Sequence, residues 1–165
     1  MSEEATLIVI AEISIALAGF SGVAATFGRR QERPWSRSER TRLANLLNHS
    51  GIALFASLIP LIFAQMDGFT PDLWTISSLS WVFFGSFGIG FALHASRKEP
   101  ATTRSRWSFI PLVAFAGLWV FQLCNALLWH LAWPYLLALA GNLGFAFIEF
   151  MGLVNPSLED EATSP

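Results

Sequence analysis

The chain has 165 residues, of which 53% are hydrophobic and 13% are charged, against roughly 25% charged residues in soluble globular domains. Fifteen Phe and seven Trp present more aromatic surface than a small soluble core can cover, so the composition excludes an ordinary soluble domain and favours lipid as the solvent. The net charge of −2 carries little information, and a single cysteine, Cys124, excludes an intrachain disulfide and a Cys-rich metal site.

Five apolar segments follow one another along the chain, and each is long enough to cross a hydrocarbon core of ~30 Å. They cover residues 5–28, 43–66, 73–96, 107–130 and 134–154. Lipid cannot satisfy backbone N–H and C=O groups, so each segment is predicted to be a helix. We therefore predict an all-α fold, a polytopic integral membrane helical bundle with one membrane domain over residues 1–165. Residues 155–165 form a short acidic tail.

Local signals place the ends of several helices. The sequence from Ser36 to Glu39, SRSE, has the spacing of a capping box and predicts that the second helix begins in water, ahead of its apolar part. Residues 70–72, TPD, predict an N-cap and a first-turn proline for the third helix. Residues 107–154 are almost continuously apolar, so the chain must turn within them, and HLAWP at 130–134 is the predicted place. The alternative is four spans with a re-entrant or interfacial last segment.

Every Lys and Arg lies in the first or the third predicted loop. Short basic loops stay in the cytoplasm, so we predict an inner (plasma) membrane protein with its N-terminus outside and its C-terminus cytoplasmic. The basic loops are also candidates for binding anionic lipid, with a topology signal alone as the alternative, and nucleic acid is not expected as a partner. The basic residues are Arg29, Arg30, Arg33, Arg37, Arg40 and Arg42 in the first loop, and Arg97, Lys98, Arg104 and Arg106 in the third.

Carboxylates occur at two positions inside the apolar segments. On the fifth segment, Tyr135, Asn142 and Glu149 are spaced by seven residues, which places them on one helix face. Glu12 is alone in the first segment. Carboxylates are costly in a bilayer and usually face protein or water. One hypothesis is therefore a polar path for protons or cations, and the alternative is hydrogen bonding between helices.

Other polar residues gather in the second, third and fourth segments. Asn45, Asn48 and His49 are predicted to share a face near the inner end of the second segment, with His94 of the third at a similar depth. Gln122 and Asn125 share a face of the fourth segment and are predicted to hydrogen-bond between helices. A structural role is the main interpretation of the first group, with proton sensing or metal binding as alternatives. No metal-ligand motif is present, and we expect no cofactor.

Small residues recur at a spacing of four, which lets helix backbones approach closely. This packing is predicted within one monomer, with contacts between subunits as the alternative. The pairs are Ala18 and Gly22, Gly22 and Thr26, Ser86 and Gly90, and Ala140 and Gly144.

No catalytic motif appears, so an enzyme is not expected. Two functional hypotheses remain. The first is an oligomeric ion or proton channel or transport unit, because a short chain needs several copies to enclose a pore. The second is a non-transporting scaffold, anchor or sensor subunit that acts through partner proteins or anionic lipid.

Overall fold

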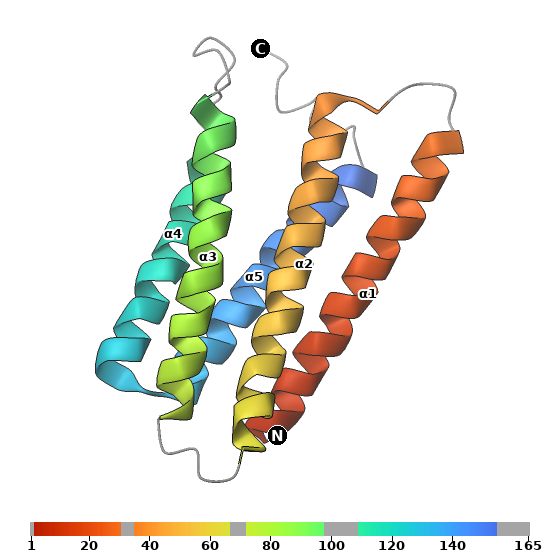
Figure 1. Ribbon diagram of the computed structural model, residues 1–165. Coiled ribbons are helices and arrows are strands. Elements are labelled where there is room, and N and C mark those ends of the chain that lie inside the picture. The colour runs from red at the N-terminus through yellow and green to blue at the C-terminus, as the bar shows by residue number, and fades with distance from the viewer. Residues whose placement is uncertain (1, 31–34, 67–71, 98–108, 155–165) are drawn as a thin grey trace.

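The computed structural model describes residues 2–30, 35–66, 72–97 and 109–154, and within these ranges the chain is helical and contains no strand. The α-helices are α1 (Glu3–Arg30), α2 (Arg37–Ala64), α3 (Leu73–Arg97), α4 (Phe109–Cys124) and α5 (Ala132–Val154). A short π-helix, η3 (Asn125–Trp129), continues α4. Figure 1 shows them as a bundle in which successive helices alternate in direction. The prediction of an all-α fold is confirmed.

Three stretches of these helices are long and apolar enough to cross a membrane: Glu3–Val23, Ser38–Ala64 and Ala132–Val154. The apolar stretches Leu73–Phe87 and Val113–Trp129 are shorter. These lengths indicate a membrane-embedded protein. The full set of five spans stays a prediction, as does the orientation.

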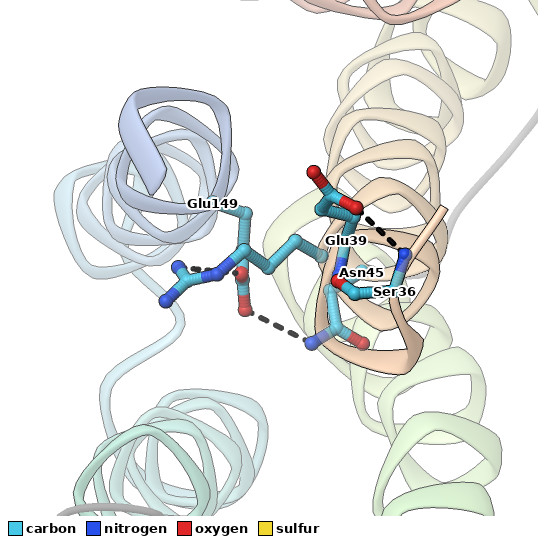
Figure 2. A network of polar contacts seen from close by, with 5 residues as sticks. Ser36, Glu39, Asn45 and Glu149 are labelled. Carbon is cyan, nitrogen blue, oxygen red and sulfur yellow. Dashed lines mark hydrogen bonds and ion pairs between the residues drawn. The ribbon is translucent and has the colours of Figure 1, made fainter. Parts of the chain in front are cut away.

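The start of α2 follows the predicted capping box. Ser36 Oγ accepts a hydrogen bond from the backbone N–H of Glu39 at 3.1 Å, and the Glu39 carboxylate accepts one from the backbone N–H of Ser36 at 2.7 Å (Figure 2). Both bonds satisfy donors that the helix start would otherwise leave without a partner. This prediction is confirmed.

The cap of α3 comes from a different residue of the predicted TPD stretch. Asp72 Oδ1 accepts hydrogen bonds from the backbone N–H groups of Trp74 at 2.8 Å and Thr75 at 3.1 Å. The carboxylate therefore supplies the N-cap interaction of a helix that begins at Leu73. Residues 70 and 71 lie outside the described ranges.

The turn between the last two helices lies within the predicted residues 130–134. It is shorter than this stretch, because only His130 and Leu131 separate η3 from α5. His130 adopts a left-handed conformation (φ 56°, ψ 38°) and ends η3, and its backbone N–H donates to Asn125 O at 2.9 Å. α5 begins two residues later, so Pro134 already belongs to its first turn. A proline is tolerated there because the first turn lacks intrahelical acceptors for its N–H groups.

α2 is the central helix, since it packs against α1, α3 and α5. α4 packs against α3 and α5, on the side of the bundle away from α1 (Figure 1). The C-terminal ends of α1, α3 and α5 lie at the same end of the bundle as the start of α2 (Figure 1). We call this the basic end, because the helix termini there carry the arginines. Leu46, Trp81, Tyr135 and Leu139 are fully buried at the centre.

Glycines allow close contacts at positions other than the predicted pairs. A Cβ added at Gly22, Gly90 or Gly144 would meet nothing within 4 Å. One at Gly85 would lie 3.4 Å from Trp119, and one at Gly141 would lie 3.1 Å from Leu118. Close packing within the monomer at the three predicted glycines is therefore not found. Those glycines leave room on the outside of the bundle, which is compatible with the alternative of contacts between subunits.

Candidate functional site: a polar seam between α2 and α5

The three polar residues of the predicted stripe on α5 all bond to α2. The Tyr135 hydroxyl donates to the backbone oxygen of Ala56 at 2.6 Å. Asn142, one heptad further on, bonds to His49, and Glu149, a heptad beyond, bonds to Asn45. We call this row of contacts the α2–α5 seam. Two polar groups that the sequence predicted separately, on the second and fifth segments, are thus largely partners of each other.

The middle contact of the seam is reciprocal. Asn142 Nδ2 donates to the backbone oxygen of His49 at 3.0 Å, and Asn142 Oδ1 lies 2.8 Å from His49 Nδ1. Because the first bond fixes which side of the amide carries the NH₂ group, Oδ1 is an acceptor and His49 Nδ1 carries the proton. The imidazole ring packs against the rings of Phe115 and Phe145, at centroid distances of 5.6 and 5.5 Å.

At the basic end, the Glu149 carboxylate is held by two residues of α2 (Figure 2). Oε1 accepts from Asn45 Nδ2 at 2.9 Å, and Oε2 lies 3.6 Å from a guanidinium nitrogen of Arg42. The Arg42 and Glu149 side chains are 23% and 18% exposed. A carboxylate at this position therefore has both a hydrogen-bond donor and a positive charge beside it, which offsets its cost near lipid.

Gly152 makes room for the Arg42 guanidinium. A Cβ added at Gly152 would overlap that group, so only a glycine lets the side chain lie against α5 at this point. Sequence reasoning treated Arg42 as part of the basic loop and did not single out Gly152. The available signal was the spacing of Arg42, Asn45 and His49, which puts them on one face of a helix.

Glu12 and Asn48 lie outside the seam. Both are exposed on the surface of the bundle. Seen along the axis of α2, Asn48 and His49 lie on opposite sides of Asn45, because they follow it by three and by four residues. Of the three residues predicted to share this face, Asn45 and His49 therefore belong to the seam and Asn48 does not. Glu12 is on the outward side of α1, opposite Leu7, Ile10 and Leu17, which are buried.

Gln122 and Asn125 bond between elements as predicted, on a different seam. Gln122 Nε2 donates to the backbone oxygen of Pro134 at 2.7 Å. Asn125 Nδ2 donates to Ser78 Oγ at 2.9 Å and to Leu131 O at 3.0 Å, while its Oδ1 accepts from the Leu131 N–H at 3.1 Å. These bonds join α4 and η3 to α3 and α5.

Few of the predicted basic residues have described side chains. Arg40 is exposed, and Arg42 belongs to the α2–α5 seam. The structure describes the backbone of several others and of His94, but not their side chains, and the remaining ones lie outside the described ranges. The first group is Arg29, Arg30, Arg37 and Arg97, and the second is Arg33, Lys98, Arg104 and Arg106.

The described contacts of the seam are hydrogen bonds and one ion pair between α2 and α5. Within the described ranges, no three His, Cys, Asp or Glu side chains come close enough to hold a metal ion. Tyr135 and Asn142 are fully buried, and the bonds they make are to α2. Comparison with known proteins adds no analogy, because no family model, curated protein or solved structure matches the chain.

Proposed function

We propose that the protein is a non-transporting membrane component, a scaffold, anchor or sensor subunit that acts through association within the membrane. The observation that carries this proposal is the use of the stripe on α5. Tyr135, Asn142 and Glu149 are the residues that would line a polar path, and each is hydrogen-bonded to α2. Side chains that hydrogen-bond to a neighbouring helix hold two helices together and fix their register.

The outward face of α1 supports action through partners. Glu12 is exposed there, and within the described ranges its carboxylate makes no hydrogen bond or ion pair. If α1 crosses the membrane, this carboxylate lies ~14 Å along the helix from its start, where contact with lipid is costly. Gly19 and Gly22 on the same helix leave open space. A neighbouring helix, from a second copy or from another membrane protein, would cover this face.

A proton or cation transport unit is the second candidate. It is favoured by one observation, the presence of two ionisable side chains, His49 and Glu149, in the same seam. In that case the hydrogen bonds of the seam would have to exchange during transport, and several copies would be needed.

Reconstitution of the full chain into liposomes separates the proposal from proton transport. Under an imposed membrane potential, a pH-sensitive dye inside the vesicles should report the same proton flux with and without the protein. The Glu149→Gln variant keeps the shape of the side chain and removes its charge, and it should behave identically. A flux above that of protein-free vesicles that Glu149→Gln reduces would overturn the proposal and establish transport.

Association is measured separately in the same vesicles. One batch of the protein carries a donor dye and a second batch carries an acceptor dye. If the partner is a second copy of this chain, energy transfer between the two batches should be seen when they share a vesicle. If energy transfer does not exceed the background level, and the protein has the mass of a single chain in mild detergent, the partner is a different membrane protein. Glu12→Gln should weaken whichever association is found. Asn48→Asp, at a position on α2 that is also exposed, is the control for a change of surface charge.

A further inference from the structure

Polar contacts also run along the seam between α3 and the α4–η3 segment, and they fix its register. The Thr75 hydroxyl bonds to His130 Nδ1, and Ser78 Oγ accepts from Asn125 Nδ2. Further along, Trp119 Nε1 donates to Val82 O at 3.0 Å. α3 and α4 run in opposite directions (Figure 1). Residue numbers along the seam therefore rise on α3 while those of their partners fall, and the three contacts follow this order.

Two buried polar atoms lie at the level between these contacts. Trp81 follows Ser78 by three residues, and Gln122 precedes Asn125 by three, so both are ~4.5 Å from the Ser78–Asn125 bond in the same direction. Both side chains are 0% exposed. Trp81 Nε1 and Gln122 Oε1 have no hydrogen-bond partner in the described part of the chain.

The Trp81 ring lies against the face of α4 that also carries Gln122. The Trp81 ring packs against Phe115 of α4 with a centroid distance of 5.5 Å. Phe115 and Gln122 are seven residues apart and therefore share a face of α4. The orientation of the Gln122 amide is fixed, because its NH₂ group donates to Pro134 O at 2.7 Å. Its oxygen is consequently the free acceptor, and the Trp81 indole N–H is the free donor.

We propose that one internal water molecule binds between Trp81 and Gln122, accepting a hydrogen bond from the indole N–H and donating one to the amide oxygen. The large majority of buried polar side-chain atoms in proteins have a hydrogen-bond partner. Buried waters serve this purpose where polar partners converge. The need is stronger within a bilayer, where no bulk solvent reaches the groups. The water joins α3 to α4 between the Ser78–Asn125 and Val82–Trp119 hydrogen bonds.

Nuclear magnetic resonance on the full chain in nanodiscs, with ¹⁵N-labelled tryptophan, tests the water directly. The Trp81 indole proton should show a cross-peak to the water resonance, with the sign expected of a bound molecule. The Trp119 indole proton, which donates to protein acceptors, is the internal control and should show none. The indole signal that disappears in Trp81→Phe is assigned to Trp81. If that variant does not fold, through-bond correlations from the indole N–H to the rest of the Trp81 side chain give the assignment. Absence of the Trp81 cross-peak overturns the proposal.

A double-mutant cycle gives an independent result. Trp81→Phe removes the donor, and Gln122→Leu removes the acceptor. If both hold one water, the double variant should lose less thermal stability than the sum of the single losses. Ser57→Ala is the control, because the buried hydroxyl of Ser57 bonds to its own helix at 2.8 Å. Its loss of thermal stability should simply add to that of Trp81→Phe or of Gln122→Leu. Additive losses for Trp81→Phe and Gln122→Leu would overturn the proposal.

Discussion

Replacement of Asn142 by Leu tests whether the α2–α5 seam holds the bundle together. The change keeps the approximate volume of the side chain, so it leaves little cavity, but it removes both hydrogen bonds to His49. Hydrogen bonds between membrane helices contribute about 0.6 kcal/mol each on average. The His49 Nδ1–H would also lose its partner, which costs ~1–3 kcal/mol. We expect a total loss of about 2–4 kcal/mol in the free energy of unfolding.

The assay is unfolding in mixed micelles with increasing SDS, followed by tryptophan fluorescence. Asn48→Leu is the matched control, since it makes the same chemical change at an exposed position of α2, and it should cost no more than ~0.5 kcal/mol. His49→Leu combined with Asn142→Leu should cost clearly less than the sum of the two single changes. A loss below ~0.5 kcal/mol for Asn142→Leu, or additive losses in the pair, would refute the reasoning.

Three further predictions concern the seam and the orientation of the chain. Tyr135→Phe removes only the hydroxyl that bonds to the α2 backbone and should cost about 0.6 kcal/mol in the same assay, whereas no loss would mean that this bond contributes nothing. Gly152→Ala should displace the guanidinium of Arg42 and cost up to ~1 kcal/mol, as for partly exposed ion pairs. In an Arg42→Ala background it should cost nothing, so an equal loss in both backgrounds would contradict this explanation. In intact cells, with Cys124 replaced, a cysteine at Ser2 should react with an impermeant reagent and one at Ser38 only after permeabilisation, and the reverse pattern would invert the predicted orientation.

The sequence by itself determined the elements of the fold. Helices are the structure that lipid permits, so apolar length alone located them. Local chemistry fixed two of their boundaries, because the capping box at Ser36 and the turn at His130 depend on residues close together in the chain. The same reasoning placed Tyr135, Asn142 and Glu149 on one face, since a heptad spacing returns to nearly the same side of a helix.

Only the tertiary structure decided which faces meet. The sequence did not show that the stripe on α5 packs against α2, because periodicity gives the direction of a side chain relative to its own helix and says nothing about its neighbour. The role of Gly152 depends on the approach of Arg42 from another helix. Glu12 and Glu149, both carboxylates in apolar segments, differ for the same reason. Packing places Glu149 beside a donor and a cation from α2, and it leaves Glu12 on the outside of the bundle.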